Sequence, residues 1–585
     1  MNPSKSHGTV VPVFTNAVPV ATREVRRHPR SSLSATIARS TWAAAIVFFT
    51  GACTPENEIE TGDAGGTLVI ALPVEPRSLL PPLLNLAQEK EIADQVYDGL
   101  ADIGPDVNTL GDAGWTPRLA ESWEWSADSL SIAFKLKPGA RFHDGHPVTS
   151  ADVRFSVELW KDPKVAARLA PNFADIDSIS TPDSLTAVAW YSRRSPEQFY
   201  NLVYSLLVMP EHALRDADRS NLASHPLSRA PLGSGPFRFV RWDARTAVEV
   251  AADSAYHLGR PKLDGVVWVL TPDPNTALNT VLAEDADLFE TVTVDGMASI
   301  AKQSKVRALP YASPNYGYLG FNMRDPKNPQ RPHPLFGDRD LRRALSMAVD
   351  RVALLQNVYD SLGYLGAGPF SRSFATADTT LDVPAYDSAA ASRLLDSSGW
   401  RDTDGDGVRE KGGRALRFGI LFPSSSTPRR RYAELIQAQL KAHGVQVDVD
   451  AADISAMAPR IFGSQFDALL NNWLTDPSPS ALRDSWHTMP AANRASNLQL
   501  FSNRAVDASI DSAMNENDAA KARAHYRAAY QGIIDEAPGI WLYENRMFMA
   551  ISQRVHPVFN GKDVWWRQLR LWSIPSDQRL PRDLQ

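Results

Sequence analysis

The most regular pattern of hydrophobic and polar residues lies within residues 119–160. Apolar side chains alternate with polar or small ones over 131–136, and this period of two predicts a half-buried strand. A Pro-Gly pair at 138–139 turns the chain, and a His-Asp-Gly triplet at 143–145 turns it again. Ser150 then stands as the N-cap of a helix, so the segment predicts a strand–turn–strand–helix unit.

Further elements are marked by helical periodicity and by short apolar runs. Residues 66–72 form a buried strand run, whereas 91–100 and 341–359 place their apolar residues on one helical face. A helix over 430–443 is followed by a strand at 445–449. This alternation of helix and strand predicts an α/β fold.

The composition is that of a soluble globular protein long enough for two or three domains. The chain has 585 residues, of which 43% are hydrophobic and 22% are charged. Its formal net charge of −6 implies no basic face for a nucleic-acid partner. The 15 tryptophans would suit a cleft that grips varied side chains, but they fill cores equally well, so no function rests on their number.

The single cysteine, Cys53, follows a segment typical of an export signal. Arginines between positions 23 and 39 precede an apolar run at 42–49 that is too short for a membrane span. Gly51 and Ala52 come directly before Cys53, and this arrangement resembles a bacterial lipobox, in which the cysteine becomes lipid-modified. A plain signal peptide with an incidental cysteine is the alternative, and either one predicts an exported protein. Residues 54–65 are polar and acidic and predict a flexible tether.

The sequence of residues 119–160 closely resembles the signature of the family 5 extracellular solute-binding proteins. These are the dipeptide- and oligopeptide-binding receptors of ABC importers. The resemblance continues in GSGPF at 233–237, YHLGRPKL at 256–263, NYGYLGFN at 315–322 and DEAPGIWLY at 535–543. It implies an α/β, two-lobed periplasmic-binding-protein fold with a small extra domain inserted in the first lobe. The ligand would lie between the lobes, which close around it by hinge bending. NYGYLGFN would be a strand that crosses between them.

The resemblance also implies where one domain gives way to the next. After the signal peptide (1–52) and the tether (53–65), the first lobe would open at residue 66. The expected parts of the folded body are the first part of lobe I (66–105), the small inserted domain (106–228), the second part of lobe I (229–312), lobe II (313–545) and a return to lobe I (546–585).

The expected function is therefore capture of a solute, most simply a peptide, and its delivery to an ABC permease and its ATPase. The protein would be a monomer without cofactors, in the periplasm or held at the extracytoplasmic face of the membrane by the lipid on Cys53. No G-x-S-x-G, H-E-x-x-H or Walker motif is present, which argues against an enzyme. The alternatives are a receptor for a non-peptide solute such as an oligosaccharide, opine or metal chelate, a sensory binding protein, and a secreted hydrolase.

The candidate ligand-binding residues come from three segments. In peptide-binding members, an aspartate three residues after a tryptophan pairs with the peptide α-ammonium, and Asp476 has that offset from Trp473. The resemblance also implies backbone contacts with an extended ligand, and it implies a cleft-facing side for the crossing strand. The further candidates are Asn472 beside Trp473, Asn85, Leu86 and Ala87 in lobe I, and Tyr316 and Tyr318 on the crossing strand. Asp476 could instead cap the turn at Pro477, and each tyrosine could instead pack in the core.

One further motif invites a metal interpretation. Residues 402–407, DTDGDG, match the first half of an EF-hand calcium loop. The twelfth position of such a loop is glutamate, but here it is Gly413, and Glu410 falls out of register. We therefore expect an acidic hairpin, and no metal ligands are assigned.

Overall fold

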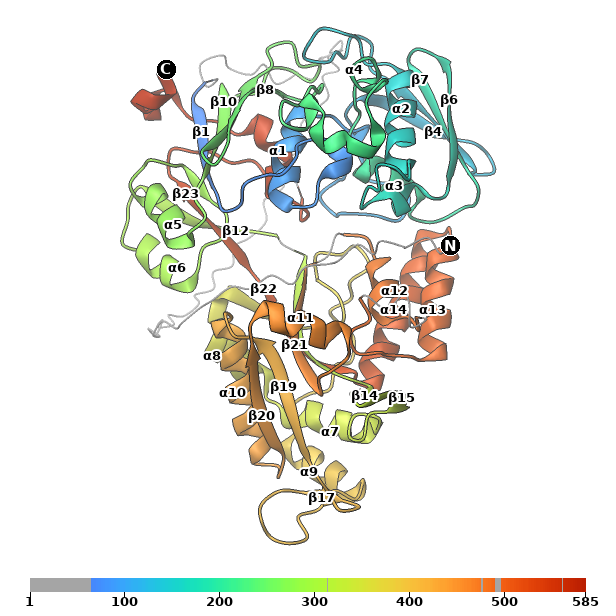
Figure 1. The fold of residues 1–585 in the computed structure, drawn as a ribbon, viewed down its shortest axis with the longest axis vertical. Helices are drawn as coiled ribbons and strands as arrows, with labels where there is room; N and C mark the ends of the chain where they lie inside the picture. Colours follow the sequence, from blue (N-terminus) through green and yellow to red (C-terminus); the bar gives the residue numbers. More distant parts are fainter. Residues whose placement is uncertain (1–64, 313, 475–476, 490–495, 560, 585) are drawn as a thin grey trace, which may run out of the picture.

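The computed structural model describes residues 65–312, 314–474, 477–489, 496–559 and 561–584. These residues form two lobes stacked along the long axis of the molecule, each built on its own large sheet (Figure 1). The upper one in Figure 1 is called lobe I here and the lower one lobe II. The α/β, two-lobed architecture expected from the sequence is confirmed.

The large sheet of lobe I has seven strands in the order β12-β23-β11-β1-β10-β9-β8. Its helices are α1 (Ala87–Val96) on one face and α5 (Pro274–Leu282) and α6 (Val294–Ile300) on the other. The strands are β1 (Thr67–Leu72), β8 (Phe237–Asp243), β9 (Ala247–Ala252), β10 (Gly265–Leu270), β11 (Leu288–Phe289), β12 (Val306–Tyr311) and β23 (Met547–Ser552). Alternate residues of β1 enter the two cores, as the period of a strand requires.

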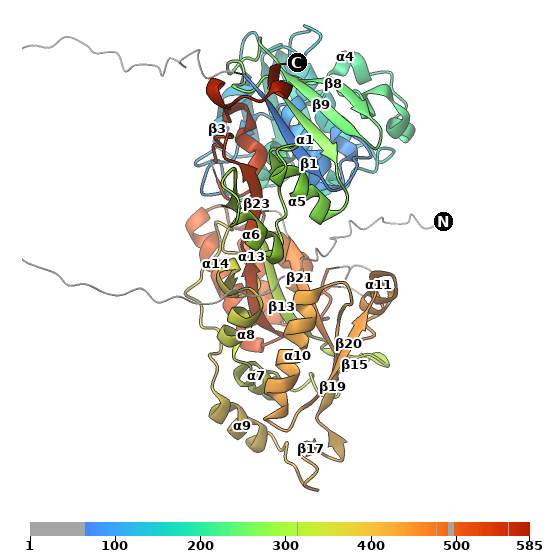
Figure 2. The same ribbon diagram turned by 90° about the vertical axis from the view of Figure 1, so that its left-hand side faces the viewer.

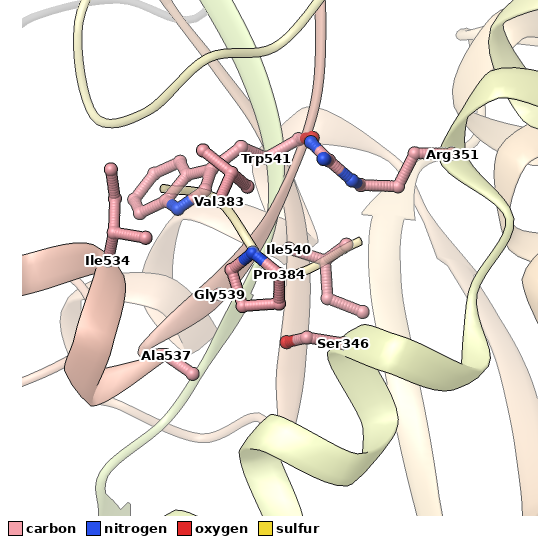
Figure 3. A pocket seen from close by; sticks show the side chains of 9 residues that line it. All are labelled: Ser346, Arg351, Val383, Pro384, Ile534, Ala537, Gly539, Ile540 and Trp541. Carbon is pink, nitrogen blue, oxygen red and sulfur yellow. The ribbon is translucent and has the colours of Figure 1, made fainter. Parts of the chain in front are cut away.

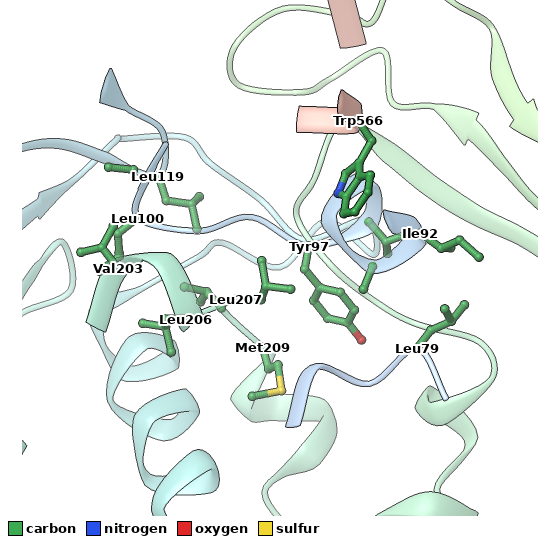
Figure 4. Close-up of a cluster of buried hydrophobic side chains, with 14 of the residues drawn as sticks. Leu79, Ile92, Tyr97, Leu100, Leu119, Val203, Leu206, Leu207, Met209 and Trp566 are labelled. Atoms are coloured by element: carbon green, nitrogen blue, oxygen red, sulfur yellow. The ribbon is translucent and has the colours of Figure 1, made fainter. Parts of the chain in front are cut away.

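Lobe I also carries a four-stranded antiparallel sheet in the order β4-β5-β7-β6. Its strands are β4 (Ala120–Trp125), β5 (Ser131–Leu136), β6 (Ile176–Asp183) and β7 (Thr186–Tyr191), and α2 (Ser150–Lys161), α3 (Gln198–Ser205) and α4 (Glu211–Leu214) accompany them. Its core is continuous with that of the larger sheet. Figure 4 shows the junction, where Ile92 and Tyr97 around α1 meet Val203 and Leu206 around α3.

A buried ion cluster ties these two parts of lobe I together. Asp98, which is fully buried, accepts hydrogen bonds from the Tyr256 hydroxyl (3.0 Å) and from Nε2 of His257 (2.7 Å). The guanidinium of Arg118, just before β4, pairs with the same carboxylate and also with Asp102 (3.2 Å). Because every charge in this cluster has a partner, its burial is tolerated.

The chain returns to lobe I at its C-terminal end. β23 inserts between β12 and β11, inside the large sheet. The guanidinium of Arg554 donates to both carboxylate oxygens of buried Asp287 (2.7 and 2.8 Å), and Arg582 donates to the same group (2.8 Å). Oδ2 of Asp287 also accepts from the backbone N–H of Val69 in β1 (2.9 Å). Segments nearly 500 residues apart thus meet at one carboxylate.

Lobe II has a six-stranded sheet in the order β16-β22-β13-β21-β19-β20. The strands are β13 (Asn315–Phe321), β16 (Gly363–Leu365), β19 (Arg417–Pro423), β20 (Gln446–Ala452), β21 (Ala468–Leu474) and β22 (Gly539–Asn545). One face packs on α7 (Arg339–Ala348), α8 (Arg351–Val358), α9 (Ser388–Ser397) and α10 (Thr427–Lys441). The other face packs on α11 (Ile454–Phe462), α12 (Ala481–Trp486), α13 (Arg504–Asn515) and α14 (Ala519–Glu536).

Two segments connect the lobes within the described part of the chain. The first leads from β12 to β13, and the second passes Arg546 between β22 and β23 (Figure 2). The strand over 315–322 that we expected to cross between the lobes lies within the lobe II sheet, and the crossing comes just before it. A pair of short connections of this kind is suited to hinge bending.

The predicted helices have different bounds in the structure. Ser150, predicted as an N-cap, is the first residue of α2 and Thr149 is its N-cap, and the helix predicted over 430–443 spans Thr427–Lys441. The other two differ more. The helix predicted over 91–100 begins at Ala87 and ends at Val96, because Tyr97 is extended. The helix predicted over 341–359 is two helices. Val349 is extended (φ −103°, ψ 115°), and the Asp350 side chain accepts from the N–H of Ala353 to cap α8.

Shorter elements complete the description. The short strands are β2 (Ala101–Asp102), β3 (Thr116–Pro117), β14 (Arg324–Asp325), β15 (Asn328–Pro332), β17 (Glu410–Lys411) and β18 (Arg414–Ala415). The 3₁₀ turns are Pro81–Leu83, Ala170–Phe173, Arg219–Ser224, Pro226–Ser228, Asp360–Leu362, Trp565–Leu571, Ser576–Gln578 and Pro581–Leu584. Among the described residues, none of the helices has the length and apolar character needed to span a bilayer.

Candidate functional site

An aromatic cluster forms the end of lobe II that is nearest the crossing segments. β13 begins directly after the crossing and pairs antiparallel with β21, so Tyr316 lies opposite Trp473 and Tyr318 opposite Asn471. The Tyr318 hydroxyl accepts from Trp473 Nε1 (3.1 Å) and donates to Gln499 Oε1 (3.1 Å). Burial raises the pKa of Tyr318 to about 12, although these hydrogen bonds act in the opposite direction.

The structure thus places three of the candidate side chains on one face of the sheet. Tyr316 and Tyr318 stack at 5.8 Å and are only 3% and 0% exposed, and Trp473 is 4% exposed. They form the packed support of this surface. Any ligand contact from them would involve ring edges at the end of the strands, where Tyr316 and Trp473 lie.

Asn472 points to the opposite face of the sheet from Trp473, because successive strand residues alternate. Its side chain is buried, and its Oδ1 has no hydrogen-bond partner among the described residues. An unsatisfied buried amide oxygen is costly, so this group has an unmet need for a donor. Asp476 and Cys53 lie outside the described residues.

The candidate residues of lobe I lie at the start of α1. The N–H groups of Asn85 and Leu86 both donate to Oε2 of Glu89 (2.7 and 2.9 Å), and Ala87 is already the first residue of α1. These two N–H groups are engaged in capping the helix, and a backbone contact of this segment with an extended ligand stays a prediction. The exposed side chain of Asn85 donates from Nδ2 to the carbonyl oxygen of Leu83 (2.9 Å).

A buried carboxylate, Glu91, and a half-buried one, Glu290, lie close to this segment. Glu91 accepts from Trp268 Nε1 (2.6 Å), and Glu290 accepts from Trp565 Nε1 (3.1 Å) and Gln88 Nε2 (3.0 Å). Burial raises the pKa of both groups, and repulsion from Glu290 raises that of Glu91 further. The indole and amide donors satisfy the oxygens without supplying a positive charge.

The two lobes also touch on the side of α3, α13 and α14 (Figure 1). Leu110, in the loop between β2 and β3 of lobe I, is 1% exposed because it packs into the aromatic cluster of lobe II. Beside it, Asn108 Oδ1 accepts from Arg523 of α14 (3.2 Å). The Ser478 hydroxyl, just beyond β21, donates to Glu197 Oε1 of lobe I (2.8 Å).

These contacts were not found by sequence reasoning. Leu110 is one leucine in a polar loop, and Glu197 and Ser478 are 281 positions apart. No local pattern distinguishes a leucine that packs across a lobe interface from one that packs in its own lobe. The contact between the lobes is seen only in the structure.

The acidic hairpin brings Asp402, Asp404, Asp406 and Glu410 together, with carboxylate oxygens within 4.8 Å of one another. By its spacing in the sequence, Glu410 falls out of register with a calcium loop. In the hairpin, however, Asp402 accepts from the N–H groups of Gly405 and Gly407, and Glu410 accepts from Thr403. These turn hydrogen bonds account for the cluster, so we assign no ligand to it.

The pocket in Figure 3 lies in lobe II between α7, β22 and residues 383–384. Arg351 lines it, but its guanidinium already donates to the carbonyl oxygens of Gly366 (2.9 Å) and Trp541 (2.8 Å). Burial lowers the pKa of Arg351 to about 10. The pocket has room for about one water molecule, which excludes it as the site of a solute.

Two α/β lobes, two connecting segments and a contact surface between the lobes define a bilobal binding protein. The model of the "Bacterial extracellular solute-binding proteins, family 5 Middle" matches residues 114–493. The chain therefore belongs to the family 5 bacterial extracellular solute-binding proteins, as its sequence had indicated.

Known proteins of the same architecture extend this result. The oligopeptide-binding protein AppA of Bacillus subtilis is 27% identical over 519 residues, which cover 86% of this chain and 92% of AppA. The structure of AppA in complex with a nonapeptide has a TM-score of 0.69 at 24% identity and covers 88% of this chain and 99% of that one. NikZ of Campylobacter jejuni in complex with Ni(L-His) has a TM-score of 0.70 at 23% identity, covering 87% and 99%. At these identities the two structures establish the shared fold.

Proposed function

We propose that this protein is the substrate-binding component of an ABC importer and that it captures peptides by closing its lobes. Membership of the solute-binding family and similarity to a protein named for oligopeptide binding support the proposal. The observation that carries it is the bilobal body with two connecting segments and a second contact around Leu110. Closure at that contact would bury a ligand held between the lobes.

The ligand site is proposed at the end of lobe II formed by β13 and β21. Trp473 and Tyr316 supply an apolar wall there, whereas the buried Oδ1 of Asn472 lies on the other face of the sheet. Asp476 would pair with the α-ammonium of the peptide, a charge-assisted bond that contributes about 1.5–3 kcal/mol. Backbone N–H groups of the peptide would donate hydrogen bonds to acceptors of the protein in this site.

The first experiment is mass spectrometry of the ligand released from the purified protein that starts after Cys53. A ladder of short peptides is the expected result, and the released masses should be those of intact peptides because this chain breaks no bond. Asp476→Asn should then weaken binding of the recovered peptides by about tenfold or more. Asp484→Asn, an exposed carboxylate on α12, is the matched control and should leave the affinity unchanged. Equal affinities for both variants would refute the pairing role of Asp476.

A non-peptide ligand is the second candidate, and one observation favours it. The N–H groups of Asn85 and Leu86, expected to bind an extended backbone, are engaged by Glu89. NikZ, which shares the fold, is in complex with Ni(L-His), so the scaffold also accommodates a metal chelate. A single released mass that is not a peptide would decide for this alternative while leaving the transport role in place.

The family is extracellular by its description. We propose further that Cys53 carries a lipid that holds the protein at the membrane surface. Expression of the full chain should place the protein in the membrane fraction, whereas Cys53→Ala should release it or block its maturation. A protein that stays soluble with Cys53 intact would contradict the anchor but not the binding role.

A further inference from the structure

Three potential metal ligands meet on the surface of lobe I, away from the proposed ligand site. Asp144 and His146 belong to the turn after Phe142, and His212 belongs to α4, 68 residues further along the chain. Nε2 of His212 lies 2.8 Å from Oδ2 of Asp144, and Nδ1 of His146 lies 3.1 Å from the same oxygen. Both imidazoles therefore aim a nitrogen at a single carboxylate oxygen.

The backbone on both sides fixes this arrangement. The turn is closed by hydrogen bonds from Gly145 N–H to Phe142 O (2.8 Å) and from Phe142 N–H to His146 O (2.8 Å). Gly145 adopts a positive φ of 92°, which the turn requires. On the other side, Asp152 accepts from the N–H of Glu211 (2.9 Å) and so holds the start of α4.

The side chains are also held in place. The rings of His146 and His212 stack with centroids 4.0 Å apart, and the Phe142 ring meets His212 edge-on at 5.7 Å. Asp144 keeps its Oδ1 on the N–H of His146 (3.1 Å), which leaves Oδ2 as the shared oxygen. The side chains of Asp144 and His212 are 32% exposed and that of His146 is 60% exposed, so an ion from solution can reach them.

These distances are close to those of a metal centre. Zinc binds imidazole nitrogen and carboxylate oxygen at about 2.0–2.2 Å, so two ligand atoms on a tetrahedral ion lie about 3.3 Å apart. The separations of 2.8 and 3.1 Å need only small side-chain shifts to reach that value.

We propose that Asp144, His146 and His212 form a binding site for a divalent transition-metal ion of the Zn²⁺ class. Three protein ligands leave the fourth position to water. The ion joins the turn at 142–147 to α4 and so fastens two segments of lobe I. The site is independent of the solute-binding role, because none of the three residues lies at the end of β13 and β21.

The test uses the purified protein without a histidine tag, titrated with Zn²⁺ by calorimetry and with Co²⁺ by visible absorption. One equivalent is expected to bind, and Co²⁺ should give the intense d–d bands of a tetrahedral nitrogen and oxygen site. His146→Ala and His212→Ala should each weaken binding by at least about tenfold. His556→Ala, an exposed histidine elsewhere on lobe I, should leave it unchanged.

His146→Ala is the sharper of the two ligand variants, since its side chain is the most exposed and its loss should not affect folding. Zn²⁺ should raise the thermal midpoint of the wild type but not that of His146→Ala. The proposal is overturned if no saturable binding occurs, or if binding survives both histidine substitutions. It is equally overturned if binding is lost in Asp402→Asn instead, because that result assigns the ion to the acidic hairpin.

Discussion

Leu110 offers a direct test of the lobe contact, because its side chain is buried by lobe II although it belongs to lobe I. In this arrangement it is 1% exposed and packs in the cluster that contains Trp473 and Trp486. If the lobes separate, the same side chain becomes exposed to water. Leu110→Ala therefore removes apolar contact from the closed form alone.

The magnitude follows from the burial. Full burial of a leucine is worth about 1.5–3 kcal/mol, and truncation in a core costs about 2–5 kcal/mol. The lobes can move slightly to fill the space, so we take about 2 kcal/mol, at the lower end. Since every 1.4 kcal/mol is a factor of ten, affinity for the peptide recovered from the protein should fall about 30-fold.

The assay is calorimetric titration with that peptide, together with urea unfolding of the ligand-free protein. Leu214→Ala is the matched control, because Leu214 is equally buried but lies wholly within the lobe I core. We expect Leu214→Ala to lower the unfolding free energy and leave the peptide affinity unchanged. Leu110→Ala should lower the peptide affinity and leave the unfolding free energy of the ligand-free protein unchanged. The reasoning is wrong if Leu110→Ala destabilises the ligand-free protein as strongly as the control and binds peptide normally.

Three further predictions concern the two cores. Glu91→Gln should flatten the pH dependence of unfolding at pH values above the ordinary glutamate pKa of 4.5. Burial raises the pKa of Glu91 in the folded state, so the wild type loses stability as the pH rises from the ordinary glutamate pKa toward the raised one. If the urea midpoints of Glu91→Gln follow the same pH profile as those of the wild type, the buried Glu91 is not the cause. Asp98→Ala leaves Arg118 without its main buried partner and should cost about 3–5 kcal/mol in urea unfolding, whereas a loss below about 1 kcal/mol would be inconsistent with the cluster. Gly317→Ala would drive a methyl group into the Tyr543 ring, so it should lower the thermal midpoint and cost about 1–3 kcal/mol of unfolding free energy. A midpoint equal to that of the wild type would show that the sheet adjusts at this position.

Local patterns were sufficient for much of the fold. The alternation over 131–136 predicted β5, and the Gly139 and Gly145 turns both adopt the positive φ that a tight reversal needs. The resemblance to the family then supplied the two-lobed architecture that periodicity alone could not. Helical periodicity was wrong where one side chain decides the backbone. Asp350 caps a new helix and so divides a continuous helical pattern into two helices.

The site was less accessible to prediction, for physical reasons. Trp473 and the two tyrosines were found because they lie on adjacent strands of a recognisable segment. Their burial, however, depends on Trp486 and Gln499, which come from later parts of the chain. The engagement of Asn85 and Leu86 by Glu89 is local, but it involves a helix that was expected to start four residues later. Leu110 and His212 acquire their neighbours only through the tertiary fold.

The position of β23 has a consequence for the order in which the protein is made. Lobe II lies in one continuous stretch of chain, so its sheet can assemble as soon as residue 545 has been synthesised. Lobe I cannot, because β11 and β12 lack their common neighbour until β23 emerges, and Asp287 lacks its arginines until residues 554 and 582 are present. Such long-range pairing forms slowly. The first lobe to leave the ribosome is therefore the last to complete its large sheet.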